Sequence, residues 1–551
     1  MSQLVETGID IDGTVIKQFS SLNLSQGIFA HHTFKLVCPA EVVDGQSNEL
    51  FTVSRNLIGL PIRIKVKSVQ EKASLAFFGV VTKVEAVRRN GHAGDIVISG
   101  YSPTILLDNG PHCKTWERKA IKNIIQDVLK QFPPGLLKYK IAPLSRETIA
   151  YTVQYKETAW QFINRIAGAY GEWLYYDGQK LLLGTPPQVD KIQLQYGTEI
   201  SRFTMSMQVK PPNIHLLAYD YLNHEVYNGV SKDIAGCAGL DDLGKHAFEK
   251  SEGLYTMQPK QWHNHFLRDK KQLEDLVNTR AAMQNSDVIR FNGISDMPGM
   301  QPGAMITVKG RNMFNQQREL FGDFTIVDID HFCDGQGNYT NHFTAVPASV
   351  KFPPVSGFTE PRCETQSALV VDNNDIKGLG RVRVKFHWMN EAERTPWLRM
   401  TMPHAGNGKG IFIIPEIGEE VIVAFEGDNA AKPYVIGTVF HGKAKAGFVS
   451  SNNDIKAIQT RSGNKIVMND KEGSIQVEDK DGNHVKMDGA GNIKVISNNS
   501  MIFQCGASKI EIRKDGVISI SGKSVDIISN ADTSIKAGTT VAVKGDLITL
   551  N

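Results

Sequence analysis

Two histidine pairs are the first candidates for chemistry in this sequence. His31 and His32 are adjacent, and one residue separates His263 from His265. Such pairs can bind a metal ion, but a zinc site needs further ligands at fixed spacing, usually cysteine, a carboxylate or an H-E-x-x-H helix. Neither pair has these neighbours in the sequence. Exposed or hydrogen-bonded histidine is the favoured interpretation, and we predict no metal ligands.

A glycine-rich segment and an acidic pair are the next candidates. The segment Gly406-Asn-Gly-Lys-Gly410 lacks the strand, the helix and the G-x-x-x-x-G-K-[ST] frame of a phosphate-binding loop, so a barrel loop is favoured. Asp241-Asp242 and the many Asp-Gly pairs resemble glycosidase carboxylates, but aspartate before glycine is first of all a turn former. A G-x-S-x-G nucleophile motif is also missing. We predict no catalytic residue and no cofactor.

The composition excludes several functional classes. Among 551 residues, 61 Lys plus Arg stand against 58 Asp plus Glu, and a formal charge of +3 gives no reason to expect nucleic acid as a partner. The N-terminus lacks a basic start and an apolar run, so we expect no cleaved signal and no membrane span. The cysteines are scattered without a C-x-x-C pair, which indicates reduced thiols of a cytosol: Cys38, Cys113, Cys237, Cys333, Cys363 and Cys505.

The first 189 residues predict strands followed by a small α+β insert. Period-two alternation over residues 1–110, as in Ile62-Arg-Ile-Lys-Val-Lys, predicts half-buried strands. A helix is predicted at about 115–130 with Thr115 as its cap, and a second helix follows Thr158. The Asp177-Gly178 turn between apolar arms predicts a hairpin. The insert therefore spans 111–189.

Strand-like alternation returns over residues 190–350. One polar amphipathic helix is predicted within it, near 266–284, with Leu273, Leu276 and Val277 on its apolar side. Three prolines between 351 and 365 predict a linker, which we place at 351–368. A compact β-rich domain follows at 369–442, so two β-rich units, an insert and a third β domain precede the C-terminal segment.

From about residue 455 to 551 the sequence repeats a pattern rather than letters. Each short unit has two apolar residues around one polar residue, which places two apolar side chains on one face of a strand. Turn clusters such as Asp481-Gly-Asn and Asp488-Gly-Ala-Gly-Asn separate the units. The apolar pairs are Ile466/Met468, Ile475/Val477, Val485/Met487, Ile493/Val495, Ile510/Ile512, Ile518/Ile520, Val525/Ile527, Val541/Val543 and Ile548/Leu550.

These strand units are too thin to be stable by themselves. Burying two Val or Ile side chains contributes roughly 3–6 kcal/mol, whereas ordering a seven-residue unit costs about 7–14 kcal/mol of backbone entropy. Three copies wound around a common axis would cover the apolar face and close the sheet edges. An ordinary antiparallel domain closed by hairpins is the alternative, but after residue 450 the only aromatic side chain is Phe503.

Residues 375–437 carry a resemblance to a known family. The segments are Asp375-Ile-Lys-Gly-Leu-Gly-Arg381-Val-Arg383-Val-Lys-Phe386-His387-Trp388, Trp397-Leu-Arg399, Ala405-Gly-Asn-Gly-Lys-Gly410, Pro415-Glu-Ile-Gly418-Glu-Glu420-Val421, Phe425-Glu-Gly427-Asp428 and Pro433-Tyr-Val-Ile-Gly437. Their order and spacing resemble the oligosaccharide/oligonucleotide-binding (OB) barrel of VgrG, the valine-glycine repeat spike of type VI secretion systems. In such a barrel Arg381, Arg383 and Trp388 could bind a nucleic acid or sugar, but in these spikes that face is occupied by protein packing. We place no ligand there.

Three further segments resemble the same family. The run from Val153 to Gly171 is similar to its hub signature, Gln301-Pro-Gly-Ala-Met-Ile-Thr-Val to a strand of its second hub barrel, and Thr460-Arg-Ser-Gly-Asn-Lys-Ile to the entry of its β-helix. The resemblance implies a mainly β homotrimer related to phage baseplate hubs and cell-puncturing spikes. It implies hub barrels at 1–110 and 190–350, an OB-fold neck at 369–442 and a triple-stranded β-helix needle at 443–551.

The resemblance also implies partners and a location. Two hub barrels in each of three chains give a pseudo-sixfold face that can seat on a hexameric Hcp-type tube. Baseplate proteins, secreted effectors and a PAAR-type tip protein at Leu547-Ile-Thr-Leu-Asn551 are the other expected partners. The spike would assemble in the bacterial cytoplasm and then be driven into a target cell.

Two alternatives remain. The first is the spike of a contractile phage tail or an extracellular phage-like particle. The second is an enzyme, a spike that hydrolyses peptidoglycan through an inserted lysozyme domain. The short stretch between Gly437 and Ile455 leaves no room for such an insert, and we expect no effector segment after residue 551. We therefore expect no enzymatic turnover.

Overall fold

The chain folds into two compact units, Met1–Val439 and Phe440–Asn551. The computed structural model describes residues 4–550 apart from 47, 48, 71, 189, 233, 312, 313, 315, 316, 356 and 358, and it describes no side chain for 89, 92, 93, 235 and 237. Most elements are strands, which confirms the predicted mainly β fold. None of the described helices has the length and apolar character that a membrane crossing requires.

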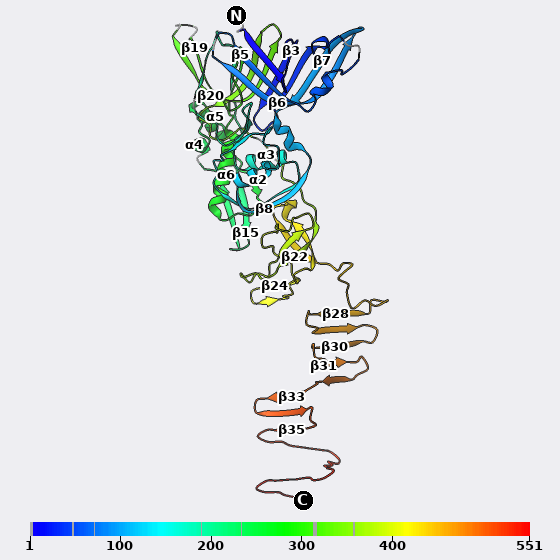
Figure 1. Cartoon of the computed structure of the whole chain (residues 1–551). Helices are drawn as coiled ribbons and strands as arrows, with labels where there is room; N and C mark the ends of the chain where they lie inside the picture. The colour runs from blue at the N-terminus through cyan, green and yellow to red at the C-terminus, as the bar shows by residue number, and fades with distance from the viewer. Residues whose placement is uncertain are drawn as a thin grey trace. The chain divides into compact units, whose positions relative to one another are not determined.

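A 13-stranded sheet, drawn in blue and green in Figure 1, is the largest element of the first unit. Its N-terminal strands are β1 (Val5–Ile11), β2 (Thr14–Val15), β3 (Ser21–Gly27), β4 (Thr33–Pro39), β5 (Pro61–Ser68), β6 (Ser74–Arg89) and β7 (His92–Tyr101). Its later strands are β13 (Ile192–Gln195), β14 (Ile200–Met207), β18 (Ile289–Ser295), β19 (Met305–Arg311), β20 (Arg318–Asp334) and β21 (Tyr339–Pro347). Because β3 pairs antiparallel with β20, the two predicted β-rich segments share one sheet.

A small α+β group separates the two sets of strands. It consists of β8 (His112–Ala120), α2 (Ile121–Leu129), β9 (Tyr139–Ile141), β10 (Thr148–Glu157), α3 (Ala159–Ala169), β11 (Leu174–Tyr176) and β12 (Leu181–Leu183). Short helical segments outside this group are α1 (Ala40–Val43), η1 (Ser54–Leu57), η2 (Pro103–Asp108) and η3 (Glu426–Asp428). β11 and β12 form the hairpin predicted at Asp177-Gly178.

Alternating burial explains why the N-terminal strands fold as predicted. In β5 the side chains of Ile62, Ile64 and Val66 are buried, whereas the basic residues between them are exposed. Ile64 pairs with Ile9 of β1 and with Phe77 of β6, so three neighbouring strands place apolar side chains side by side. These side chains belong to the same core as the apolar sides of α2 and α3.

The first predicted helix begins later than expected. α2 starts at Ile121 after Ala120, not at 115. Thr115 lies in β8 instead, where it is buried and pairs with Val153 of β10. Residues that were predicted to begin the helix therefore pair as a strand. The predicted apolar stripe is buried: Ile121, Ile124, Ile125, Val128 and Leu129.

α3 begins after Thr158, as predicted. Thr158 Oγ1 accepts a hydrogen bond from Gln161 N at 3.1 Å, and Gln161 Oε1 accepts one from Thr158 N at 2.9 Å. This capping box satisfies two backbone donors at the helix start. On the buried side, Phe162 stacks on Trp116 of β8 with ring centroids 4.9 Å apart.

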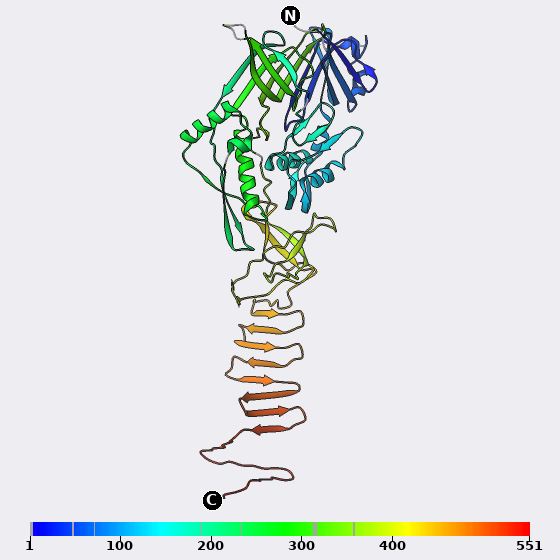
Figure 2. The same ribbon diagram turned by 90° about the vertical axis from the view of Figure 1, so that its left-hand side faces the viewer.

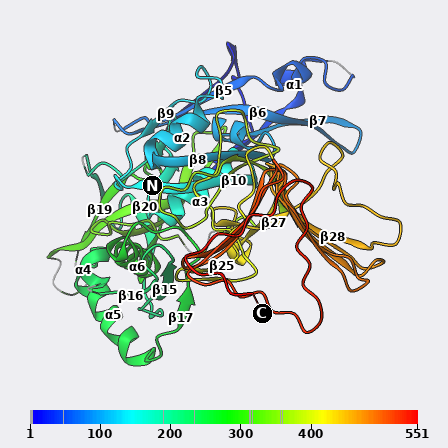
Figure 3. The same ribbon diagram turned by 90° about the horizontal axis from the view of Figure 1, so that it is seen from below.

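A second group of helices interrupts the later strands. It consists of β15 (His215–Asp220), β16 (Glu225–Val230), α4 (Ile234–Ala238), α5 (Asp242–Leu254), β17 (Lys260–Trp262) and α6 (Lys270–Asn285), grouped at the lower left of Figure 3. The sequence predicted only one helix here, near 266–284, and that position belongs to α6. The prediction of a single helix is wrong, because α4 and α5 are also present. α5 is polar with a weak apolar stripe, so its sequence gives little helix signal. Its start depends on Asp241, whose Oδ1 accepts a hydrogen bond from Gly244 N at 2.7 Å.

A four-stranded sheet follows in the order β23-β22-β26-β27. The strands of this region are β22 (Gln366–Asp372), β23 (Arg383–Phe386), β24 (Ala405–Gly406), β25 (Lys409–Gly410), β26 (Glu420–Phe425) and β27 (Pro433–Thr438). Its core includes Val384 and Phe386 together with Tyr151, Val153 and Tyr155 of β10. This sheet and the α+β group therefore share buried apolar surface.

Arg165 of α3 is the centre of a buried ion-pair cluster. Its Nε and Nη2 donate to the two carboxylate oxygens of Glu157 at 2.8 and 2.7 Å, and its Nη1 lies 3.3 Å from Glu360. Glu360 belongs to the predicted linker 351–368 and also lies 3.2 Å from His265 Nε2. Ion pairs thus tie this linker, of which residues 356 and 358 are not described, to α3 and to the segment after β17.

The second unit is a succession of short antiparallel strands, which Figure 2 shows as a ladder of rungs joined by turns. They are β28 (Ile455–Gln459), β29 (Lys465–Asn469), β30 (Ser474–Glu478), β31 (His484–Met487), β32 (Ile493–Ile496), β33 (Ser500–Cys505), β34 (Ser508–Arg513) and β35 (Ile518–Ser521). The first five form one sheet and the last three another, each in sequence order.

The turns of this unit repeat one hydrogen-bond motif. Asp479 Oδ1 accepts from the backbone N of Asp481 and of Asn483, both at 2.9 Å, and Asn483 Nδ2 donates to Asp479 Oδ2 at 2.7 Å. Asp488 and Asn492 make the same contacts. The hydrogen bond from the asparagine side chain lowers the pKa of each aspartate. The aspartate turns predicted here are confirmed.

The last predicted strand units do not form strands in the single chain. Residues 522–550 contain no assigned strand. The affected pairs are Val525/Ile527, Val541/Val543 and Ile548/Leu550. A strand needs a hydrogen-bonded neighbour, and this segment does not fold back on itself as β28–β35 do.

Replacing Arg165 with Met tests the buried ion-pair cluster. The Arg165 side chain is 6% exposed and that of Glu157 11%, so the substitution leaves buried carboxylates without their cation. We expect Arg165→Met to lower the free energy of unfolding of the first unit by about 3–5 kcal/mol, measured by urea unfolding.

Lys119→Met is the matched control, because the ion pair of Lys119 with Asp127 at 2.8 Å lies at the surface. We expect Lys119→Met to change the free energy of unfolding by less than about 1 kcal/mol. Equal effects of the two substitutions would contradict the importance of the buried cluster.

Candidate functional site: an uncovered apolar face

The five-stranded sheet of the second unit carries two columns of apolar side chains on one face. Residues that pair across neighbouring strands lie side by side, and residues i and i+2 of a strand share a face. The first column is Ile458, Ile466, Val477, Val485 and Val495. The second column is Met468, Ile475, Met487 and Ile493. We call these nine side chains the apolar face.

The three-stranded sheet continues the same arrangement. Its paired residues form one column of Phe503, Ile510 and Ile520 and a second of Met501, Ile512 and Ile518. The predicted strand pairs from 466/468 to 518/520 therefore lie on one face of their strands, as expected from the repeat.

The apolar face is exposed in the single chain. Val477 is 48% exposed and Ile493 69%, whereas Ile64 in the first unit is 1% exposed. All nine side chains of the apolar face are exposed, and no residue described in the second unit covers them. Contiguous exposed apolar surface of this kind marks an interaction site in a folded protein.

The opposite face of the same strands is polar over β30–β32 and carries Ala457 and Val467 on β28 and β29. Gln476, Lys486 and Lys494 pair across β30, β31 and β32, and Lys465 Nζ lies 3.0 Å from Glu478 Oε1 between β29 and β30. One face of the sheet thus carries side chains suited to contact with water, and the other carries side chains suited to burial. Because each half-exposed Val or Ile would gain roughly 1 kcal/mol on full burial, the apolar face provides a driving force for association.

The first predicted histidine pair is held by hydrogen bonds. His31 lies 2.9 Å from Asp108 Oδ2, and its ring stacks on Trp160 with centroids 4.3 Å apart. His32 is buried and lies 3.1 Å from Gln26 Nε2. Burial lowers the pKa of His32 to about 3, so its ring is neutral at physiological pH.

The second histidine pair lies beside Glu360. The rings of His263 and His265 stack with centroids 4.8 Å apart, and burial lowers the pKa of His263 to about 2. Among the described residues, no group of three or more His, Cys, Asp or Glu side chains is arranged to hold a metal ion. The thiols of Cys38, Cys113, Cys333, Cys363 and Cys505 are free, and the Cys237 side chain lies outside the described residues.

The arginines of the predicted barrel surface have partners within the chain. Arg381 Nε and Nη2 donate to Asp375 at 2.9 and 2.7 Å, and Arg383 Nη1 lies 3.2 Å from Glu117. Trp388 stacks on Phe386 with ring centroids 5.4 Å apart. These three side chains are engaged in packing, so the surface offers neither a free arginine nor a free ring face among them.

The remaining sequence candidates have structural roles. Gly406-Asn-Gly-Lys-Gly410 contains the two short strands β24 and β25, which pair as a hairpin. Asp241 is the N-cap of α5, and Asp242 is the first residue of that helix. The acidic pair therefore begins a helix, which is a structural role as predicted.

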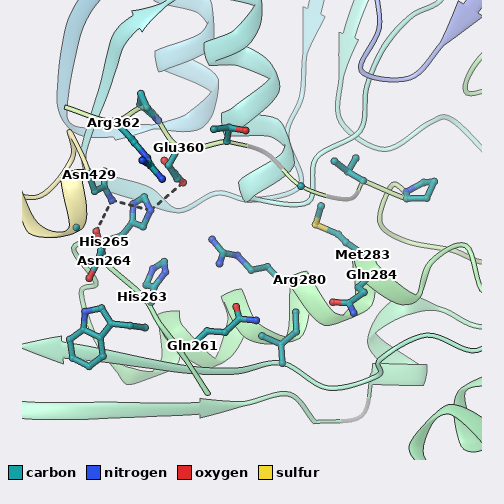
Figure 4. A pocket seen from close by; sticks show the side chains of 18 of the residues that line it. Gln261, His263, Asn264, His265, Arg280, Met283, Gln284, Glu360, Arg362 and Asn429 are labelled. Atoms are coloured by element: carbon teal, nitrogen blue, oxygen red, sulfur yellow. Dashed lines mark hydrogen bonds and ion pairs between the residues drawn. The ribbon is translucent and has the colours of Figure 1, made fainter. Parts of the chain in front are cut away.

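One feature of the first unit was not predicted from the sequence. A cavity of about 910 Å³ lies between β17, α6 and residues 359–362. Figure 4 shows Arg280 of α6 extending into it opposite Arg362 and Glu360. These residues come from distant parts of the sequence and belong to no local motif, so only the fold brings them together.

Comparisons with protein families match most of the chain. The model described as phage tail baseplate hub (GPD) matches residues 41–337. The model described as type VI secretion system/phage-baseplate injector OB domain matches residues 366–440. The second match confirms the OB fold predicted for this region.

Individual relatives and a solved structure agree with these families. Type VI secretion system spike protein VgrG1a of Pseudomonas aeruginosa is 22% identical over 89% of this chain and 89% of its own length. VgrG4b of the same organism is 34% identical, but over only 27% of this chain and 19% of its own length. A chain in the lidded PdpA-VgrG complex of Francisella aligns with a TM-score of 0.55, covering 95% of this chain and 80% of that chain at 8% identity.

A polar substitution on the apolar face tests whether it is covered in solution. In an isolated open sheet, Val477→Asn changes a half-exposed side chain and should have little effect. If the face is buried by association, the amide loses water without a partner, which costs about 1–3 kcal/mol per chain. We expect Val477→Asn to increase backbone hydrogen exchange across β28–β32, measured on the full chain by mass spectrometry.

Lys494→Asn on the polar face of the same sheet is the matched control. We expect its exchange to equal that of the unsubstituted chain. If both variants exchange like the unsubstituted chain, the apolar face is not buried in solution.

Proposed function

Because this chain belongs to the phage tail baseplate hub (GPD) family and is similar to VgrG spike proteins, we propose that three copies form a spike of a type VI secretion system. The apolar face of the second unit carries the proposal. It needs an apolar partner surface, and an identical chain presents one of matching length and residue type. Three sheets wound about one axis turn every apolar face inward and leave every polar face in water.

The unpaired C-terminal segment supports the same assembly. Residues 522–550 contain the predicted apolar pairs Val525/Ile527, Val541/Val543 and Ile548/Leu550 but have no strand partner within the chain. In an intertwined trimer each such segment obtains its backbone partners from the other two chains. The number three comes from the family resemblance, whereas the need for a partner comes from the exposed face.

We propose that the first unit seats the spike on an Hcp-type tube. Its two β-rich segments lie in one continuous sheet, so each chain presents two related groups of strands. Three chains then present six, which suits a hexameric ring. Baseplate proteins would contact the same unit from its outside, and the OB region, residues 366–440, would join it to the needle.

The tip and cargo belong to this proposal. Leu547 and Leu550 are 86% and 92% exposed, so a PAAR-type protein that caps the end would bury them. The needle punctures the target envelope when a sheath contracts, and it carries effectors with it. The spike assembles in the bacterial cytoplasm and leaves with the apparatus. The work is mechanical, and we propose no covalent chemistry for this chain.

A contractile phage tail or phage-like particle is the second candidate. The family that matches residues 366–440 is named for both type VI secretion systems and phage baseplates. In either machine the apolar face has the same role. The two candidates differ in the particle to which the spike is attached.

Deleting the gene from its bacterium tests the proposed machine. We expect the Hcp-type tube protein to disappear from the culture medium, because tube and spike leave the cell together. The full chain should restore secretion, and residues 1–445 alone should not, since they lack the needle. Immunoblots of medium and cells measure both outcomes.

Unchanged secretion of the tube protein after deletion would contradict the type VI assignment. Loss of tailed particles with capsids, seen by electron microscopy of the same strains, would support the phage alternative instead. A chain carrying Lys494→Asn controls for expression, and we expect it to restore secretion fully.

A further inference from the structure

We propose that the joint between the two β-rich halves of the large sheet opens when the protein is acidified. The joint is the antiparallel ladder of β3 with β20, both labelled in Figure 1, which connects the N-terminal strands to the later strands. A buried hydrogen-bond network with two histidine rings crosses this ladder and carries the proposal. The network lies within the first unit, and the proposal is independent of the proposed function.

The centre of the network lies on the buried face of the ladder. Gln26 of β3 is buried and pairs with Ile329 of β20, and His331 of β20 is buried and pairs with Leu24 of β3. His331 Nε2 donates to Gln26 Oε1 at 2.9 Å, so this hydrogen bond crosses from one half of the sheet to the other. Gln26 Nε2 donates to Nδ1 of His32, between β3 and β4, at 3.1 Å. One amide therefore links the two imidazole rings.

The outer ends of the network also fit neutral rings. Because Nδ1 of His32 is an acceptor, the neutral ring carries its hydrogen on Nε2, which donates to Gly27 O at 3.2 Å. Because Nε2 of His331 is a donor, its Nδ1 is free to accept from the Tyr339 hydroxyl at 2.7 Å. That hydroxyl in turn accepts from Asn341 Nδ2 at 3.1 Å. Each of the four ring nitrogens thus has one partner, and all four partners are uncharged.

A proton added to either ring disrupts this network. On His32 the new hydrogen would lie on Nδ1 and face the amide hydrogens of Gln26. Reversing the amide only passes the mismatch to His331, because its Nε2–H would then face the same amide hydrogens. On His331 the new hydrogen would lie on Nδ1 and face the Tyr339 hydroxyl, whose own hydrogen would lose its acceptor. Buried donors without acceptors destabilise a fold, so the closed joint favours two neutral rings.

The groups around His32 do not compensate a positive charge on its ring. Its electrostatic neighbour is His31, whose own positive charge would oppose a second one. The carboxylate of Asp108 in η2 lies 2.9 Å from His31 and is engaged with that ring. From β11, the Tyr176 ring packs edge-on against His32 with ring centroids 5.5 Å apart. Burial is the largest effect and lowers the pKa of His32 to about 3.

The groups around His331 act in the same direction. Burial, and then the charge that His32 would carry, lower the pKa of His331 to about 3. Burial, and then the nearby Cys333 and Asp296, raise the pKa of Tyr339, so its hydroxyl keeps the hydrogen that it donates to His331. Both rings are therefore neutral while the joint is closed.

The direction of the pH effect follows from the lowered pKa of both rings. Parting β3 from β20 breaks the hydrogen bond between His331 and Gln26 and lets water reach the rings, whose pKa then returns towards the ordinary value of 6.5. The open joint therefore binds more protons than the closed one. The joint is fully stable above pH 6.5 and loses stability as the pH falls towards 3. In this range each ring shifts the opening equilibrium by about tenfold per pH unit, and two rings shift it by about 100-fold.

Backbone hydrogen exchange of the full chain between about pH 6 and pH 4.5, corrected for the intrinsic exchange rate at each pH, tests the proposal. We expect the protection of β3 and β20 to fall by about 100-fold per pH unit, and that of β5 by less than about tenfold. His32→Asn keeps an acceptor for Gln26 but cannot titrate, so it should reduce the pH dependence to about tenfold per unit. His331→Gln keeps a donor for Gln26 and should have the same effect.

His246→Asn is the matched control, because His246 is exposed on α5. We expect it to leave the pH dependence of β3 and β20 at about 100-fold per unit. Circular dichroism at neutral pH checks each fold, and if one ring variant does not fold, the other decides. Protection of β3 and β20 that does not change with pH, an equal loss of protection in β5, or an unchanged pH dependence in a folded ring variant would overturn the proposal.

Discussion

The second unit depends on burial of an apolar face that its own chain leaves in water. β28–β32 form a sheet one layer thick, with Ile466, Val477 and Val485 in one column across it. A sheet with one apolar face is stable only against another layer, and the described part of this unit contains none. The backbone ladder fixes which side chains share the face, and the hydrophobic effect then requires a partner. The exposed apolar face is therefore the feature on which the proposed trimer depends.

The first unit satisfies the same requirement within one chain. The apolar face of β1, β5 and β6 shares a core with α2 and α3, and the barrel strands share a core with β10. Arg165, Glu157 and Glu360 join these parts by buried ion pairs. The two units thus differ physically: the first buries its apolar side chains within one chain, whereas the second leaves its apolar face exposed.

Local sequence patterns predicted the strands whose apolar and polar side chains alternate and the helix that begins with a capping side chain. The strand β5, the Thr158 capping box and the strand pairs up to Ile518/Ile520 follow from periodicity and short-range hydrogen bonds. Long-range effects explain the misses. The residues before α2 pair in the β8–β10 ladder and so form a strand instead of a helix. The start of α5 depends on the Asp241 cap rather than on an apolar stripe. Residues 522–550 have no strand partner in one chain. The cavity around Arg280 was invisible because its residues meet only after folding.

The mass of the purified full chain in solution tests the central claim most directly. Sedimentation at micromolar concentration should give a particle of three times the chain mass of 60.9 kDa. A chain that lacks residues 446–551 should dissociate into single chains more readily than the full chain does. A single 60.9 kDa chain with a C-terminal segment protected from hydrogen exchange would contradict the account. In that case the apolar face would be stable without any partner.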